Sequence, residues 1–171
     1  SIFDPLGIVA PVVLGGKLVQ RAAIKSNDAK VSDPTYWDQP LPPECKKDWA
    51  SWLATLQGLD ALQIPRCVVP KDFGEVVSRE LHVFADASQD AIGYVMYVRS
   101  VDEERKIHVC FLTADSKVGP KAATSMPRLE LCAAVEAAQS SRAVIAEMVK
   151  AFDSVHYYSE SKVVLGYLRN R

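Results

Sequence analysis

The stretch Leu81-His-Val-Phe-Ala-Asp-Ala-Ser88 decides how this chain of 171 residues is expected to fold. Its run of apolar residues, broken only by a histidine, predicts a short β-strand. Because side chains alternate along a strand, Asp86 falls on the same face as His82 and Phe84, at the carboxyl end of the run. Sites gather at such strand ends in α/β-type sheets, so Asp86 is the first candidate for chemistry.

Two further strands are predicted after this one. Ala91-Ile-Gly-Tyr-Val-Met-Tyr-Val98 and Lys106-Ile-His-Val-Cys-Phe-Leu112 are rich in β-branched and aromatic residues. The charged segment 99–105 between them predicts an antiparallel hairpin, with Asp102 and the two glutamates after it in a solvated turn.

A helix and a fourth strand complete the pattern. The helix is predicted from about Pro127 to Phe152 with a cap near Ser125, the strand over Ser154–Ser159, and a second helix from Lys162. Three strands followed by a helix and another strand predict a mixed sheet covered by helices, an α+β or α/β fold. The long helix is the crossover that would place the fourth strand parallel to the first.

The first eighty residues differ in composition from the rest of the chain, because eight of the ten prolines lie there. Short helices joined by stiff turns are expected. One helix is predicted over about Val12–Lys25 and another over about Pro43–Leu59. Trp49 and Trp52 lie on one stripe of the second helix, which indicates packing between helices rather than stacking on bases.

Composition excludes several classes of protein. The chain is 49% hydrophobic and 24% charged, and its formal net charge of −1 gives no global attraction to a polyanion, so any contact with nucleic acid must rest on a local patch. No apolar run reaches the ~18–20 residues that a membrane span needs. The sequence also lacks a glycine-rich phosphate-binding loop, so no small-molecule cofactor is expected. The four scattered cysteines indicate reduced thiols in an intracellular protein. The start at Ser1 and the end at Arg171 within a helical pattern suggest a piece of a longer chain.

Two more carboxylates occur where a solvated surface charge is not expected. Glu130 lies one turn into the long helix, and Glu160 follows the fourth strand. The helix face that carries Glu130 is small and apolar: Ala133, Ala134, Ala137, Ala138 and Ser141. If the first and fourth strands are neighbours, Asp86, Glu130 and Glu160 converge, and a hard divalent cation such as Mg²⁺ resolves their repulsion. The alternative for each residue alone is a capping or surface carboxylate.

The remaining polar candidates are weaker. His82, His108 and His156 all lie in strand patterns, which favours half-buried strand residues over metal ligands. Six residues around the acidic centre are predicted to contact nucleic acid: Ser88, Lys117, Lys121, Arg128, Ser161 and Lys162. For the basic ones, a solvated position on a loop is an equal alternative.

Three motifs together resemble a known family. Ser1-Ile-Phe-Asp-Pro-Leu-Gly-Ile-Val-Ala-Pro11, Leu81–Ser88 and Met126-Pro-Arg-Leu-Glu-Leu-Cys-Ala-Ala134 resemble the polyproteins of BEL/Pao-type LTR retrotransposons, in the part that follows the reverse transcriptase palm. The resemblance implies a helical thumb or connection-like segment over residues 1–79 and an RNase H-like domain over residues 80–171. It further implies a five-stranded mixed sheet with flanking helices, here incomplete at its C-terminus. The rest of the reverse transcriptase and integrase polyprotein is the implied partner.

The resemblance also implies a chemistry. In RNase H-like enzymes, acidic residues hold two Mg²⁺ or Mn²⁺ ions about 3.5–4 Å apart and hydrolyse the RNA strand of an RNA–DNA hybrid. Asp86 matches the acid on the first strand, and Glu130 matches the acid on the first long helix. Where the family has Asp-Ser after the fourth strand, this chain has Glu160-Ser161, and the extra methylene predicts weak turnover. The sequence also ends before the later helix that carries the family's fourth acid, so the resemblance implies an incomplete two-metal site. The alternative is a catalytically degenerate module that binds or scaffolds nucleic acid.

Overall fold

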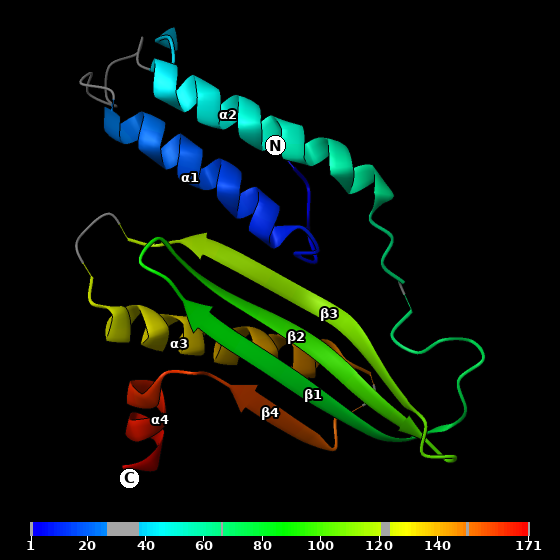
Figure 1. Ribbon diagram of the computed structural model, residues 1–171. Helices are drawn as coiled ribbons and strands as arrows, with labels where there is room; N and C mark the ends of the chain where they lie inside the picture. Colours follow the sequence, from blue (N-terminus) through cyan, green and yellow to red (C-terminus); the bar gives the residue numbers. More distant parts are fainter. Residues whose placement is uncertain (1, 27–37, 66, 121–123, 150, 171) are drawn as a thin grey trace. The chain divides into compact units, whose positions relative to one another are not determined.

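The chain forms two compact units in a computed structural model (Figure 1). The structure describes residues 2–26, 38–65, 67–120, 124–149 and 151–170. The helical unit comprises Val9–Gln63 together with Ile2, and the sheet unit comprises Phe3–Ile8 and Ile64–Arg171. The short segment Phe3–Ile8 therefore belongs to the sheet unit, although the helical unit follows it in sequence.

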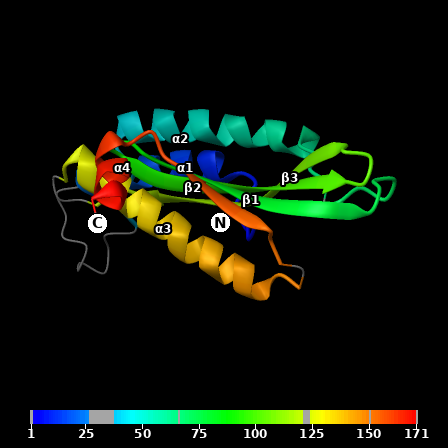
Figure 2. The same cartoon turned by 90° about the horizontal axis from the view of Figure 1, so that it is seen from below.

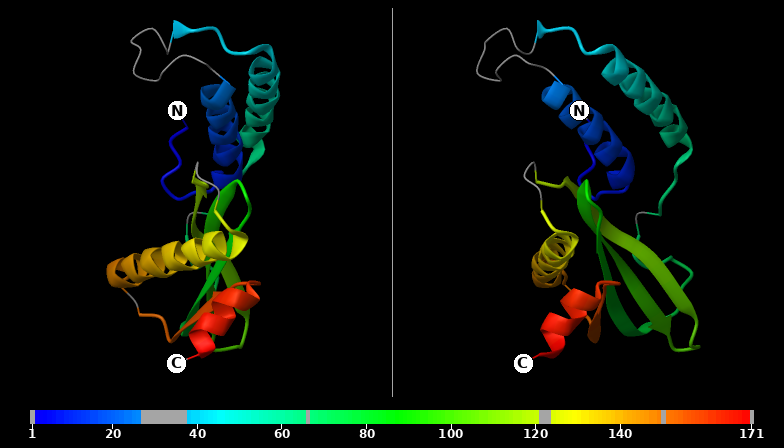
Figure 3. Two further views of the ribbon diagram at one scale, coloured as in Figure 1. Left: turned by 90° about the vertical axis from the view of Figure 1, so that its left-hand side faces the viewer. Right: turned by 60° about the vertical axis from the view of Figure 1, so that its left-hand side comes forward.

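Two helices pack side by side in the helical unit (Figure 3). They are α1 (Ala10–Ser26) and α2 (Pro43–Leu56), and a short 3-10 helix, η2 (Gln57–Ala61), follows α2. The indole nitrogen of Trp52 donates a hydrogen bond of 2.7 Å to the carbonyl oxygen of Val12. A side chain at Gly16 would clash with the indole, because its Cβ would lie 2.5 Å from Trp52 Cζ2. The predicted packing of this tryptophan between helices is confirmed.

The sheet unit contains a mixed sheet with the strand order β3-β2-β1-β4 (Figure 1). Its strands are β1 (Val76–Ala87), β2 (Ala91–Asp102), β3 (Ile107–Val118) and β4 (Ser154–Tyr158). β1 pairs with β2 and β2 with β3 in the antiparallel sense, whereas β1 and β4 are parallel. The predicted mixed sheet with a parallel fourth strand is confirmed. The described residues contain four strands, so the fifth stays a prediction.

The crossover between β3 and β4 contains α3 (Met126–Glu147), which lies against one face of the sheet (Figure 2). Its apolar stripe closes a core whose fully buried members are Leu81, Val83, Met96 and Ala137. Because side chains alternate along β1, the residues between the buried ones, such as His82, point to the opposite face. A last helix, α4 (Lys162–Arg169), follows β4.

Two details differ from the sequence-based predictions. α3 ends at Glu147 rather than near Phe152, because Met148 adopts an extended conformation (ψ 122°) and Phe152 packs against the sheet core. The hairpin strands are longer than predicted, and the solvated position predicted for Asp102 is wrong, since it is 1% exposed. Asp102 Oδ1 accepts a hydrogen bond of 2.8 Å from the backbone nitrogen of Lys106, so the carboxylate closes the turn from inside.

The segment Phe3–Ile8 docks on the edge strand β3. The carbonyl oxygen of Leu6 accepts hydrogen bonds from the backbone nitrogen of Ala114 (2.8 Å) and from Thr113 Oγ1 (3.1 Å). Gly7 has a φ of +71°, and a Cβ there would lie 1.7 Å from the carbonyl oxygen of Ala114. Only glycine combines this φ with so close an approach. Gly7 therefore lets the segment Phe3–Ile8 come close enough to β3 to accept a hydrogen bond from the backbone of this edge strand.

Gly7→Ala is expected to destabilise the sheet unit by at least about 2 kcal/mol, because the new methyl group meets backbone at a strained φ. Urea denaturation followed by circular dichroism measures the change. Gly166→Ala is the matched control, since no atom lies within 4 Å of a Cβ at this position of α4. It is expected to stabilise the chain by about 0.5–1 kcal/mol. Equal free energies of unfolding for Gly7→Ala and the parent would contradict the docking of this segment.

Candidate functional site

Two of the predicted site residues lie at the carboxyl ends of neighbouring strands, Asp86 as the last residue but one of β1 and Glu160 just after β4. The parallel pairing of β1 with β4 ends at Phe84 and Tyr158. Asp86 and Glu160 each come two residues later in the chain. Glu130 lies in the first turns of α3, and Figure 1 shows these turns at the same end of the sheet as the arrowheads of β1 and β4. The structure thus brings the three acids to one end of the sheet, which we call the acidic end.

A hydrogen bond joins α3 to the turn after β4. Ser161 is 4% exposed, and its hydroxyl donates to Glu130 Oε2. The same hydroxyl accepts a hydrogen bond of 3.2 Å from the backbone nitrogen of Val164, which makes Ser161 the N-cap of α4. One buried serine therefore fixes both the first turn of α4 and the position of the Glu130 carboxylate.

The other two acids are exposed. Asp86 Oδ1 accepts a hydrogen bond of 2.7 Å from the backbone nitrogen of Ala87. For the carboxylate of Glu160, the described part of the chain shows neither a hydrogen bond nor an ion pair. The three acids are not gathered into a ligand cluster: among the described residues, the one group of three acidic, histidine or cysteine ligand atoms within 4.8 Å of one another lies elsewhere. Bringing them onto one cation requires rotation of the exposed side chains.

The two serines predicted to contact nucleic acid hold turns of the fold. The hydroxyl of Ser88 accepts a hydrogen bond of 3.1 Å from the backbone nitrogen of Ala91 in the turn between β1 and β2. The hydroxyl of Ser161 is shared between Glu130 and Val164. Contacts of these serines with nucleic acid stay predictions.

The predicted basic contacts differ in how free their charges are. Arg128 and Lys162 are exposed in the first turns of α3 and α4. Lys117 instead pairs with Glu136, with 2.6 Å between Nζ and Oε2, and this hydrogen bond raises the pKa of the lysine. Lys121 lies outside the described residues. Of the predicted basic residues that the structure describes, Arg128 and Lys162 thus have exposed side chains at the starts of helices, and their contact with a phosphate stays a prediction.

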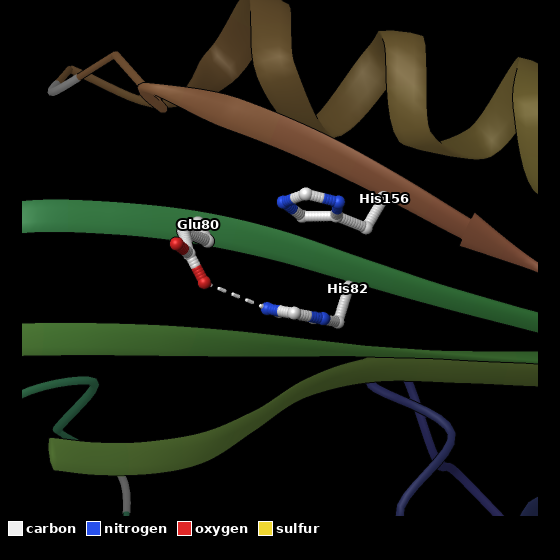
Figure 4. A group of neighbouring side chains, drawn as sticks. All are labelled: Glu80, His82 and His156. Carbon is white, nitrogen blue, oxygen red and sulfur yellow. Dashed lines mark hydrogen bonds and ion pairs between the residues drawn. The ribbon is translucent and has the colours of Figure 1, made fainter.

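Sequence reasoning missed a group of side chains on the face of the sheet opposite α3 (Figure 4). This histidine cluster consists of Glu80, His82 and His156, with one ligand atom of each within 4.8 Å of the others. His82 Nε2 lies 3.1 Å from Glu80 Oε2, and Arg99 Nη1 lies 2.9 Å from the same oxygen. The pKa of Glu80 is lowered from its usual value, mainly by the hydrogen bond from His82 and to a lesser extent by the Arg99 guanidinium.

Part of the histidine cluster was visible in the sequence. Glu80 and His82 are two residues apart in a strand, so they share a face. The position of His156 depends on the register of β1 against β4, and no local pattern in the sequence gives that register.

The fold and the acidic end define a class of protein. A mixed sheet with two antiparallel pairs, a parallel β1–β4 pair and a crossover helix over one face is an α+β fold consistent with the RNase H-like kind. The family described as Pao retrotransposon-like RNaseH-like domain matches residues 1–161. The chain belongs to this family, and the match covers both units. A comparison with curated proteins gives no match.

The helices give no sign of a membrane span. Within the parts of the chain that the structure describes, no helix combines the length and the apolar character needed to cross a bilayer.

Ser161→Ala removes both contacts of the buried hydroxyl. It is expected to lower the free energy of unfolding by about 1–2 kcal/mol, because an N-cap and a hydrogen bond to a carboxylate are lost together. Ser161→Thr keeps a hydroxyl and should stay closer to the parent. Thermal and urea denaturation measure both variants, and identical stability of Ser161→Ala and the parent would rule out the proposed link between Glu130 and α4.

Proposed function

We propose that this chain binds an RNA–DNA hybrid at its acidic end and hydrolyses the RNA strand weakly with divalent metal. The observation that carries the proposal is the hydrogen bond from Ser161 to Glu130, because it ties the second acid to the turn that holds Glu160. Membership of an RNase H-like family supports nucleic acid as the substrate class. The helical unit would act as a thumb or connection-like part, and the remainder of a reverse transcriptase and integrase polyprotein would be the partner.

The donor set at the acidic end fits Mg²⁺ or Mn²⁺. Mg²⁺ prefers carboxylate oxygens and keeps several of its waters. Asp86 and Glu160 are exposed, and among the described residues neither is paired with a lysine or an arginine. Together with Glu130 they would hold the metal, which supplies an activated water and stabilises the leaving oxygen when bound.

The chain's own residues would position the acids and attract the phosphates of the hybrid. Ser161 holds the Glu130 carboxylate through a buried hydroxyl, while Asp86 sits at the end of the central strand β1. Arg128 and Lys162 are exposed on the first turns of the two helices that flank this end. A helix N-terminus and a basic side chain both attract phosphate oxygens, so the hybrid backbone has an electrostatic reason to lie here.

Two features of the acidic end predict weak turnover. Glu160 is one methylene longer than aspartate, and catalytic geometry tolerates displacements of only about half an ångström. The Glu130 carboxylate already accepts a hydrogen bond, and in the described structure the three acids do not form a ligand cluster. The same observations favour a second function, in which the chain binds the hybrid without cleaving it.

Cleavage of a labelled RNA–DNA hybrid in Mg²⁺ or Mn²⁺ tests the hydrolase. Asp86→Asn is expected to lower the rate at least about tenfold, because a metal ligand is lost. Glu103→Gln is the matched control, since it also converts an exposed acid to its amide. Glu103 lies in the hairpin turn after β2, whereas Asp86 pairs with Gly93 near the opposite end of β2.

Fluorescence anisotropy with the same hybrid separates the two functions. Binding together with cleavage that depends on Asp86 supports the hydrolase. Binding without such cleavage contradicts the hydrolase and supports the binding module. A chain that does not bind the hybrid contradicts both.

Glu160→Asp tests the effect of the extra methylene. The shorter side chain is expected to raise the affinity for Mn²⁺ and the cleavage rate, because it restores the carboxylate position that the family uses. Calorimetric titration with Mn²⁺ and the cleavage assay measure the two effects. Equal affinity and equal rates for Glu160→Asp and the parent would show that the longer side chain is harmless.

A further inference from the structure

We propose that the histidine cluster is a binding site for a borderline transition metal such as Zn²⁺, separate from the acidic end. Its potential ligands are two imidazoles and one carboxylate. This is a donor set of three-ligand zinc sites, which keep a fourth position for water. Imidazole nitrogen suits Zn²⁺, Co²⁺ and Ni²⁺, whereas Mg²⁺ prefers oxygen ligands. The cluster would therefore select a different ion from the one proposed for Asp86 and its partners.

The backbone places the two imidazoles together. His82 and His156 are direct partners in the parallel pairing of β1 with β4. Their rings are stacked, with centroids 5.0 Å apart and planes inclined by 23°. Glu80 precedes His82 by two residues, so its side chain leaves the same face of β1 (Figure 4). Strand pairing, rather than a flexible loop, thus fixes where all three side chains begin.

The present separations are close to those of a metal site. A tetrahedral zinc with bonds of about 2.0–2.1 Å holds its ligand atoms about 3.3 Å apart. His82 Nε2 and Glu80 Oε2 are already 3.1 Å apart, and all three ligand atoms lie within 4.8 Å of one another. The remaining adjustment falls on His156, which is the exposed member of the cluster.

Neighbouring hydroxyls orient the rings. His82 Nδ1 lies 2.9 Å from the hydroxyl of Tyr158, so the nitrogen placed for a metal is Nε2, which faces Glu80. Ser154 Oγ lies 2.9 Å from His156 Nε2. Metal-binding histidines usually have the second ring nitrogen held by a hydrogen bond, which fixes the tautomer and the ring orientation. The Tyr158 hydroxyl can accept from Nδ1–H of His82, and it would hold the ring in this way in the tautomer whose Nε2 is free to bind a metal.

Arg99 opposes metal binding. Its Nη1 lies 2.9 Å from Glu80 Oε2, and its charge repels a cation at the cluster. Its side chain is 31% exposed, so it has water into which the guanidinium can turn, and Glu80 has a second carboxylate oxygen to offer. Removing Arg99 should therefore strengthen metal binding. If the cluster were only a structural ion pair, removing Arg99 would instead weaken it.

Calorimetric titration with Zn²⁺ tests the proposal. Cys67 and Cys132 are exposed and also attract zinc, so the accessible thiols are first blocked with a maleimide. His156→Ala is expected to lower the affinity for Zn²⁺ at least about tenfold, because a ligand is lost. His108→Ala is the matched control: it removes the remaining histidine of the chain, which lies on β3 beside Phe73 and outside the cluster.

Two further variants sharpen the test. Arg99→Gln is expected to raise the Zn²⁺ affinity about fivefold, because one repelling charge is removed. Asp86→Asn should leave it unchanged, so a failure of this proposal is distinguishable from a failure of the proposed hydrolase. Replacement of Zn²⁺ by Co²⁺ should give visible bands of a tetrahedral ion without sulfur-to-metal charge transfer. Absence of Zn²⁺ binding, or equal losses in His156→Ala and His108→Ala, would overturn the assignment.

Discussion

The parallel pairing of β1 with β4 is the constraint on which the rest of the sheet unit depends. Parallel neighbours cannot be joined by a tight turn, so the chain must cross over before it reaches β4. The crossover is α3, and it buries Leu81 and Val83 of β1 beneath it. The same path returns the chain so that Asp86 and Glu160 lie at adjacent strand ends. The hydrogen bond from Ser161 to Glu130 then connects the start of α3 to this end of the sheet.

The alternation of side chains along β1 lets one strand serve several purposes. Leu81 and Val83 face α3, whereas Glu80 and His82 face the other way and meet His156. Asp86 lies four residues beyond His82 in the sequence, which corresponds to about 13 Å along a strand. A cation at the histidine cluster and a cation at the acidic end would therefore use different ligands. This separation is why each proposal can be tested without disturbing the other.

Local patterns in the sequence predicted the elements but not the contacts between distant ones. Apolar alternation identified the strand around Val83, and helical periodicity identified α3, so the mixed sheet with its parallel fourth strand could be predicted. The convergence of the three acids on one cation stays a prediction. The burial of Asp102 could not, because it depends on backbone donors in its own turn. The docking of Gly7 on β3 and the partnership of His82 with His156 depend on long-range register. No residue type marks such a register in a single sequence.

The central claim is the proposal that a divalent cation binds at the acidic end, held by Asp86, Glu130 and Glu160. Paramagnetic broadening of backbone amide signals by Mn²⁺ tests it most directly, because broadening falls steeply with distance from the ion. The account predicts selective broadening around Ala87, Leu131 and Ser161, no effect at the hairpin turn 103–106, and loss of the effect in Asp86→Asn. Uniform broadening along the chain, or broadening that survives Asp86→Asn, would contradict it.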